Sequence, residues 1–267
     1  MNSSHYQVRP GKRLLLSEIP THDDGGYDKQ TAREEFRKLH KRLVDLEELL
    51  YADGRHAVLV VLQGMDTSGK DSTIRAVFGG VGPTGVRVAS FKQPTTVERS
   101  HDFLWRVHAK TPARGNLTIF NRSHYEDVLI VRVENLVPEK QWKRRYDHIN
   151  AFEKLLADEG AVIVKFFLHI SKDYQKQRLQ RRLNNPRKHW KFDAGDLPVR
   201  ARWDDYMKAY EEALRRCSTP HAPWYVVPAE RRWFRNLLIT RVLVDTLESL
   251  DMKYPEPTFD PSKIKID

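Results

Sequence analysis

The fold is decided by residues 64–72, which read Gly64-Met65-Asp66-Thr67-Ser68-Gly69-Lys70-Asp71-Ser72. The spacing G-x-x-x-x-G-K is that of a phosphate-binding loop (P-loop), and it follows the most apolar run of the chain, 57–62, and precedes a helical pattern. Glycines let the backbone wrap around a phosphate, the N–H groups point at it, and Lys70 supplies a positive charge. A glycine-rich turn with a chance lysine is the alternative, which the strand–loop–helix context disfavours.

The loop departs from the usual pattern directly after its lysine. A P-loop normally has Ser or Thr there, whose hydroxyl helps to hold Mg²⁺, whereas here Asp71 follows Lys70 and Ser72 comes one place later. Asp66 adds a second carboxylate, and two carboxylates would repel a phosphate unless a cation lay between them. We therefore infer a Mg²⁺ site at Asp66, with Mn²⁺ as an alternative ion. Asp71 is either a contact of that site or a first-turn acid that complements the helix dipole.

Outward from the loop, apolar runs alternate with helical patterns. The runs predict strands at 56–63, 86–90, 117–121, 161–169 and 224–228. Amphipathic patterns predict helices at 29–51, 70–79, 96–108, 123–133, 138–159, 171–183, 200–217 and 230–250. This alternation predicts an α/β fold with a five-stranded parallel sheet flanked by helices, which binds ligands at the carboxyl ends of its strands.

We expect one domain over 29–250, an irregular leader over 1–28 and an extended tail over 251–267. The long helix at 29–51 is expected to pack on its own domain, with a subunit contact as the alternative, and we expect a homo-oligomer.

The composition points to a polyanionic partner. The 267 residues include 46 Lys and Arg against 36 Asp and Glu, a net charge of +10, which suits nucleic acid, a phosphate-rich small molecule or an anionic membrane surface. The single cysteine, Cys217, excludes a disulfide framework and a cysteine zinc cluster, and it fits a reducing cytoplasm. No apolar run approaches the roughly 18–20 residues that span a bilayer, and residues 1–27 lack a signal-peptide core. We therefore expect a cytoplasmic protein without a membrane partner.

A second polar constellation, Asn121-Arg122-Ser123-His124-Tyr125-Glu126-Asp127, follows the predicted strand 117–121. P-loop enzymes often carry a metal-associated acid at such a strand end. Here the strand ends in Asn121, so we predict Asp127 as a second metal ligand with Asp66, and Glu126 as a nucleotide or secondary metal contact. Arg122 is placed to meet a transferring phosphoryl group. A Ser–His nucleophile pair is disfavoured, because adjacent residues rarely face each other.

A third constellation is basic and extends over 178–191. Arg178, Arg181 and Arg182 share one face of the predicted helix, and Pro186 ends it. An arginine-lined helix that opens into a polar loop is typical of a lid that closes over phosphates and excludes water. We predict a lid over about 178–198, with a solvated charged face as the alternative.

Five segments together resemble the polyphosphate kinase 2 family over roughly residues 30–250: GMDTSGKDSTI, FKQPTTVERSHDFLWRVHAKTPARG, NRSHYEDVLIVRV, QRLQRRLNNPRKHWKF and PWYVVPAERRWFRN. The resemblance implies a P-loop kinase fold related to thymidylate kinase, with a lid. It implies Mg²⁺-dependent phosphoryl transfer between inorganic polyphosphate and adenine or guanine nucleotides. Asp66 and Lys70 then fall in the Walker A loop, and Asn121, where many family members have Asp, begins the Walker B-type segment. The NRSHYEDV form resembles the class III subgroup, which carries AMP through ADP to ATP.

We therefore predict five catalytic residues, Asp66, Lys70, Arg122, Arg178 and Arg182. The predicted nucleotide and phosphate contacts are Gly64, Met65, Thr67, Ser68, Gly69, Asp71, Ser72, Arg75, Asn121 and Glu126. An ATP-dependent nucleoside monophosphate kinase of the same fold is the nearest alternative. A basic nucleic-acid-binding protein is a second alternative, but the sequence has no helix-turn-helix, zinc-finger or RNP signature.

Overall fold

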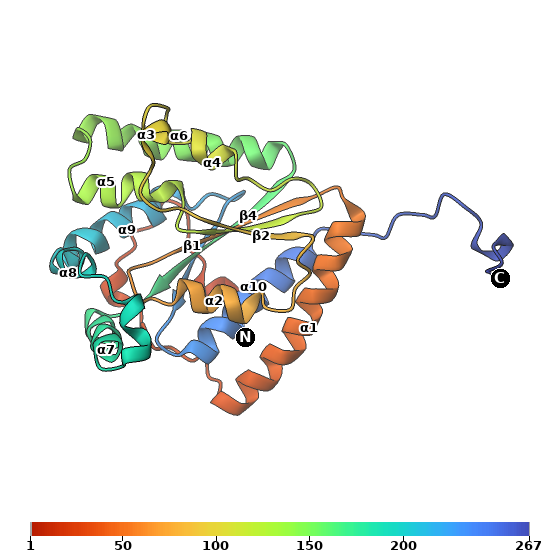
Figure 1. Cartoon of the computed structure of the whole chain (residues 1–267), viewed down its shortest axis with the longest axis horizontal. Helices are drawn as coiled ribbons and strands as arrows, with labels where there is room; N and C mark the ends of the chain where they lie inside the picture. Colours follow the sequence, from red (N-terminus) through yellow and green to blue (C-terminus); the bar gives the residue numbers. More distant parts are fainter. Residues whose placement is uncertain (1, 267) are drawn as a thin grey trace.

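A five-stranded parallel sheet forms the centre of the molecule. The computed structural model describes residues 2–266 (Figure 1), so residues 1 and 267, the outer ends of the predicted leader and tail, lie outside the described residues. The strands are β1 (Ala57–Gln63), β2 (Val86–Ser90), β3 (Leu117–Asn121), β4 (Ala161–His169) and β5 (Trp224–Pro228). Their order is β2-β3-β1-β4-β5, and every pairing is parallel. The predicted parallel sheet is therefore confirmed, with β1, which leads into the P-loop, at its centre.

Helices cover both faces of the sheet (Figure 1). They are α1 (Lys29–Asp53), α2 (Lys70–Val77), α3 (Thr96–Arg99), α4 (Trp105–His108), α5 (Ile130–Val133), α6 (Glu139–Asp158), α7 (Lys172–Leu183), α8 (Asp196–Ala201), α9 (Trp203–Cys217) and α10 (Arg232–Glu248). Short 3₁₀ helices lie at Ser3–Tyr6, Leu16–Glu18, His124–Val128, Pro186–Lys191 and Pro261–Lys263. α10 contacts α1, α2 and β5, whereas α6 contacts α5, α9 and β4.

The long helix α1 packs on its own domain, as predicted. The Asp28 carboxylate caps its N-terminus, and Gly54 ends it in the left-handed region at φ 65°. Its buried leucines recur at steps of three and four along one face, Leu39, Leu43, Leu46 and Leu50, and this side contacts α10.

Three predicted helices are wrong in detail. The segment 96–108 forms two short helices, because the Asp102 carboxylate accepts the Leu104 N–H at 2.9 Å and starts a new turn. The segment 123–133 begins as a 3₁₀ helix and breaks at Leu129, whose φ and ψ of −105° and −89° are not helical. Helix 200–217 is interrupted at Arg202, with α8 before it and α9 after it.

The two ends of the chain differ in their contacts. In the leader, Val8 and Leu16 are buried and Gln7 forms a bridge with Tyr225 of β5. Beyond Lys253, whose N–H donates to Asp53, the tail runs away from the body (Figure 1). No helix within residues 2–266 combines the length and the apolar character that crossing a membrane requires.

Candidate active site

The P-loop connects the carboxyl end of β1 to the start of α2, and its backbone requires glycine. Gly64 and Gly69 have φ angles of 149° and 106°, in the region that favours glycine. A Cβ at Gly64 would lie 2.8 Å from the Leu168 carbonyl oxygen, and one at Gly69 would lie 2.1 Å from the Arg235 guanidinium. The two signature glycines therefore permit a close approach of the backbone to its neighbours, in addition to the turn itself.

Lys70, the first residue of α2, lies across this loop. Its Nζ donates to the carbonyl oxygens of Gly64 at 2.6 Å and Met65 at 3.3 Å, and the side chain is only 8% exposed. Burial lowers the pKa of the Lys70 ammonium, an effect that the Asp66 carboxylate opposes. Because Lys70 bonds only to neutral carbonyls, its charge is available to a phosphate oxygen.

Arg122 contacts the loop from the end of β3. Its Nη2 lies 2.5 Å from Asp66 Oδ1, and its backbone has a φ of 62°, held by an N–H bond to the Leu62 carbonyl at 3.1 Å. Burial would raise the pKa of Asp66, but the positive charges of Lys70 and Arg122 outweigh it and hold that pKa below its usual range. Asp66 is therefore an ionised carboxylate.

A second contact joins the same two strand ends. The Asn121 side chain donates to Asp71 Oδ1 at 2.7 Å. Because β1 and β3 are neighbours in the sheet, the loop and the 121–127 segment meet, as the sequence predicted for the carboxyl ends of parallel strands.

The predicted lid region faces the loop from α7 and the segment after it. Arg182 Nη1 donates to the Lys191 carbonyl at 2.8 Å and lies 3.3 Å from Asp196 Oδ2. Arg178 has no carboxylate within ion-pair distance in the part of the chain that the structure describes. Gln175, which is fully buried, donates to the Asp66 carbonyl at 3.1 Å and so ties α7 to the P-loop.

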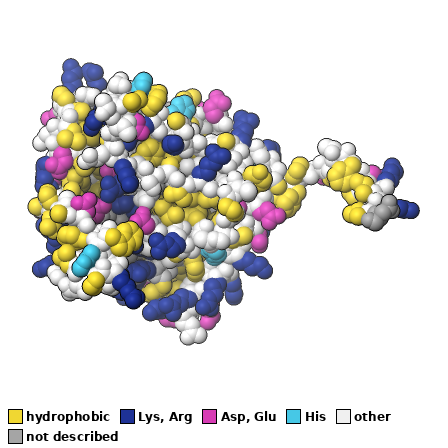
Figure 2. Space-filling view, in the orientation of Figure 1, with side chains coloured by type: hydrophobic (Ala, Val, Ile, Leu, Met, Phe, Trp, Pro, Cys, Tyr) yellow, Lys and Arg dark blue, Asp and Glu magenta, His cyan; other side chains and the backbone are white. Residues whose placement is uncertain are grey.

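These elements enclose a cavity of about 630 Å³, which we call the phosphate cavity. Nine basic and three acidic side chains line it, and in Figure 2 dark blue and magenta side chains meet in a hollow on the left of the view. The predicted site residues on its walls are Asp66, Thr67, Gly69, Lys70, Asp71, Ser72, Arg75, Asn121, Arg122, Arg178 and Arg182. Gly64, Met65 and Ser68 belong to the loop without lining the cavity.

Glu126 and Asp127 lie in different surroundings although they are adjacent in the chain. Burial raises the pKa of Glu126 even though the charges of Arg122 and Lys70 oppose it, so Glu126 lies beside the P-loop cluster. Asp127 instead pairs with Arg145, Oδ1 to Nη1 at 2.8 Å, and burial raises its pKa to about 6. The structure does not bring Asp127 to Asp66, and the prediction that the two share a metal has no geometric support.

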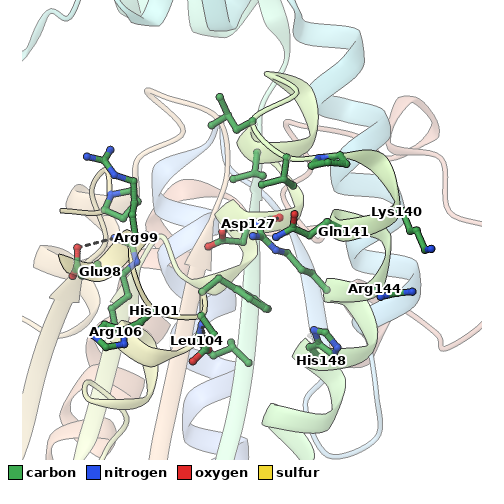
Figure 3. A pocket seen from close by; sticks show the side chains of 18 residues that line it. Glu98, Arg99, His101, Leu104, Arg106, Asp127, Lys140, Gln141, Arg144 and His148 are labelled. Atoms are coloured by element: carbon green, nitrogen blue, oxygen red, sulfur yellow. Dashed lines mark hydrogen bonds and ion pairs between the residues drawn. The ribbon is translucent and has the colours of Figure 1, made fainter. Parts of the chain in front are cut away.

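Asp127 lines a second cavity of about 1050 Å³, which we call the side cavity (Figure 3). It lies between the α3–α4 segment and α5–α6, and its walls combine aromatic or apolar side chains with charged ones. They include Phe103, Leu104, Leu136, Val137, His101, His148, Glu98, Arg99, Arg106, Lys140, Arg144 and Arg145. Arg106 lines the side cavity and contacts two residues of the phosphate cavity: it donates to the Lys92 carbonyl at 2.8 Å and lies over the Phe91 ring.

The model of the family "Polyphosphate kinase 2 (PPK2)" matches residues 26–255. The chain belongs to the polyphosphate kinase 2 family. It is 57% identical, over 98% of its length and 99% of the other, to an "AMP/ADP-polyphosphate phosphotransferase" of Meiothermus ruber. It is 44% identical, over 97% and 94% of the two lengths, to an "ADP-polyphosphate phosphotransferase" of Rhodopseudomonas palustris. The crystal structure of polyphosphate kinase 2 from Arthrobacter aurescens TC1 superimposes with a TM-score of 0.93 at 41% identity, covering 97% of this chain and 93% of that one. These findings confirm an enzyme with the predicted P-loop kinase fold.

Sequence reasoning missed Arg235 in this polyphosphate kinase 2 chain. Arg235 lies on α10 beneath the P-loop, where its guanidinium donates to the Ser68 carbonyl at 3.4 Å and to Ser72 Oγ at 3.2 Å. No local signal distinguishes Arg235, because Arg232 lies in the first turn of the same helix and Ser68 is 167 residues away in the chain.

It also missed a fully buried polar cluster behind the 121–127 segment. Lys165 Nζ pairs with Glu153 and donates to Tyr125 Oη at 2.8 Å, while Tyr125 Oη and His124 Nε2 lie 2.9 and 3.1 Å from Glu153 Oε1. His124 is thereby committed to a structural contact.

Proposed function

We propose that the protein transfers phosphoryl groups between inorganic polyphosphate and nucleoside mono- and diphosphates, taking AMP through ADP to ATP. The observation that carries this proposal is the lining of the phosphate cavity. Its walls hold nine basic side chains, and Phe91 is the only aromatic residue among the described residues that line it. Such a site suits a chain of phosphates, which is bound through charge, more than a nucleotide donor, which needs a stacking surface for its base.

The transfer requires positioning and charge neutralisation more than covalent chemistry. The bond between the terminal phosphorus of polyphosphate and its bridging oxygen breaks, and a bond from an acceptor phosphate oxygen to that phosphorus forms. Polyphosphate is shortened by one unit and AMP becomes ADP. Lys70 and the loop N–H groups hold the transferring group, and Arg178 and Arg182 neutralise the donor chain from α7. Arg122, oriented by Asp66, meets the charge that develops between donor and acceptor.

The residues present fit a divalent cation, which we propose to be Mg²⁺, with Mn²⁺ as an alternative. Asp66 is ionised and lines the cavity, and its Oδ2 has no hydrogen bond within residues 2–266, so it is free to bind a cation. No group of three or more His, Cys, Asp or Glu side chains in that range is arranged to hold a metal, and Mg²⁺ in kinase sites needs only one or two carboxylates beside phosphate oxygens and water. The cation would neutralise charge on the phosphates.

The side cavity is the proposed place of the nucleoside. Donor and acceptor phosphates must meet at the P-loop, and the lid arginines lie on one side of it, so the nucleoside must approach from another side. Arg106 of the side cavity contacts Lys92 and Phe91 of the phosphate cavity, and the side cavity offers Phe103 and two histidines as flat surfaces, with Asp127 as a polar group. This assigns Asp127 to nucleotide binding in place of the metal.

The test is a reaction with purified protein, AMP, Mg²⁺ and polyphosphate but no ATP, followed by nucleotide chromatography. We expect ADP and then ATP. Reactions without polyphosphate, and with ATP as the only donor, are the controls. ADP formation that needs ATP would establish the nucleoside monophosphate kinase alternative, and DNA that outcompetes polyphosphate on a filter would favour nucleic-acid binding.

Two further predictions concern the protein's state. We propose a homo-oligomer, which light scattering coupled to gel filtration tests. We also propose a reducing cytoplasmic location, because the chain has a single cysteine, Cys217, which is buried and forms no disulfide. Fractionation of cells that produce the protein tests the location.

A further inference from the structure

Arg235 is a buried cation without an acidic partner. Its side chain is 2% exposed. Its bonds go to the Ser68 carbonyl, to Ser72 Oγ and to Asn236 Oδ1, the last at 3.0 and 3.1 Å from Nη2 and Nε. All of these acceptors are neutral, and no carboxylate among residues 2–266 lies within ion-pair distance of Arg235.

The nearest charged side chains that act on Arg235 are positive. Burial lowers the pKa of the Arg235 guanidinium to about 10, Tyr174 opposes this shift, and the positive charges of Arg232 and Arg178 add to it. The group is still charged at neutral pH. Two other buried cations, Lys165 and Arg145, have a carboxylate beside them, Glu153 and Asp127. Lys70 on the wall of the phosphate cavity is, like Arg235, bonded to neutral oxygens. An unpaired buried charge is costly, so its compensation is expected from a group that binds nearby.

The position of Arg235 indicates which group that is. Ser68 and Ser72 bracket Gly69, Lys70 and Asp71, whose N–H groups begin α2 and would face a phosphate bound in the loop. The guanidinium touches this stretch so closely that a Cβ on Gly69 would lie 2.1 Å from Nη1. A phosphate chain in the loop would therefore bind only a few ångströms from a desolvated positive charge.

We propose that Arg235 is a positioning residue whose counter-charge is the bound phosphate chain. It holds the P-loop from behind through Ser68 and Ser72, and the anion in front of the loop compensates its charge. The inference rests on the proposed function. It requires that removal of the Arg235 charge weakens phosphate binding but does not lower the stability of the ligand-free protein. A purely structural role would instead lower that stability and leave phosphate binding unchanged.

The experiment uses Arg235→Met, which keeps the bulk and removes the charge, with Arg241→Met as the matched control. Arg241 lies on the same helix, is partly exposed and pairs with Glu35. Thermal unfolding is measured with and without tripolyphosphate, and KM is measured for polyphosphate and for AMP. For Arg235→Met we expect an unchanged or higher Tm without ligand, a smaller ligand-induced rise in Tm, and a KM for polyphosphate raised roughly tenfold. The KM for AMP stays unchanged, and Arg241→Met leaves both KM values at their wild-type level.

A lower Tm without ligand, together with an unchanged KM for polyphosphate, would overturn the inference. Arg235→Lys provides a second check if the Met variant folds poorly, because it keeps the charge. We expect its KM for polyphosphate within about threefold of wild type, and a loss as large as that of the Met variant would contradict the role of charge. If the wild-type protein turns over polyphosphate and Arg235→Met has the wild-type KM, this inference alone is contradicted. If the wild-type protein does not turn over polyphosphate, the proposed function is contradicted and the inference with it.

Discussion

Replacement of Lys165 by Met would break the buried polar cluster that supports the active-site segment. Lys165 and Glu153 are fully buried, and the cluster ties β4 and α6 to His124 and Tyr125. Burial would raise the pKa of Glu153, but Lys165 and His124 outweigh it and hold that pKa below its usual value. His124 and Tyr125 lie on the 3₁₀ helix His124–Val128, which also carries Glu126. The cluster therefore fixes a segment of the proposed site.

The magnitude follows from the charge that the substitution leaves behind. Removal of one partner of a buried ion pair costs about 3–5 kcal/mol, because the other charge stays buried and unpaired. For Lys165→Met this corresponds to a fall in Tm of about 6–20 °C. Without Lys165, the pKa of Glu153 in the folded protein rises above its unfolded value. The folded state then binds the proton more tightly, and the loss of stability grows as the pH rises from that unfolded value through the raised one.

Equilibrium urea unfolding, followed by circular dichroism and tryptophan fluorescence, measures the effect at pH 5 and pH 8. Lys154→Met is the matched control, since Lys154 pairs with Asp158 on the exposed side of α6, the helix that carries Glu153. This substitution should lower the free energy of unfolding by less than about 0.5 kcal/mol. The double variant Glu153→Gln/Lys165→Met leaves no unpaired charge and should lie within about 1 kcal/mol of wild type. A double variant as unstable as the single one would refute this reasoning.

Four further substitutions test the site, each assayed by phosphoryl transfer from polyphosphate. Lys70→Ala should abolish transfer with an unchanged circular dichroism spectrum, and retained turnover would contradict the P-loop assignment. Arg178→Ala should lower kcat by about 10- to 100-fold, whereas an unchanged rate would favour the alternative that the arginines of α7 form a solvated charged face. Glu126→Asn should impair AMP more than ADP as acceptor, and equal effects would remove the basis for the class III resemblance. For wild type, the KM for AMP should rise as the pH falls from 7 to 5, because Asp127, with a pKa of about 6, becomes neutral. For Asp127→Asn, the KM for AMP should be high over the whole range from pH 7 to pH 5. Protonation of the AMP phosphate affects wild type and variant equally, so equal pH profiles of the KM in the two proteins would argue against a role of Asp127 in binding AMP.

The sheet and the P-loop were predictable because their signals are local. Each strand is a short run of apolar residues, and the observed β3 and β4 coincide with the predicted ranges 117–121 and 161–169. The loop glycines are required by backbone geometry, which a spacing pattern captures directly. A ligand site at the carboxyl ends of the strands was predicted, whereas the contact of Asn121 with Asp71 depends on β1 and β3 being neighbours, which the sequence did not indicate.

The separation of Glu126 from Asp127 was not predictable from their adjacency. They lie on a 3₁₀ helix with three residues per turn, so their side chains point about 120° apart. One therefore lies beside Lys70 and Arg122, and the other pairs with Arg145. The pattern in this segment favoured an α-helix, and only the packing against α6 and α9 decides which side chain faces which cavity.

Arg235 is a different kind of miss. Its partner Ser68 is 167 residues away in the chain, so no spacing rule connects them. The same holds for Glu153, whose three partners come from two other elements, the 3₁₀ helix His124–Val128 and β4. Contacts of this kind arise from tertiary packing, for which a single sequence carries no local signal.

The distribution of charge is what favours polyphosphate over ATP as the phosphoryl donor. The walls of the phosphate cavity carry nine basic and three acidic side chains, a net charge of +6, whereas the whole chain has a net charge of +10. A nucleotide donor carries few charges and a large flat base, and this cavity offers such a base little beyond Phe91. The side cavity has the opposite character, with a phenylalanine and two histidines beside charged groups of both signs. The two linings therefore favour the proposal that a phosphate chain and a nucleoside bind in separate cavities, because a linear anion is held mainly by charge and a base chiefly by shape.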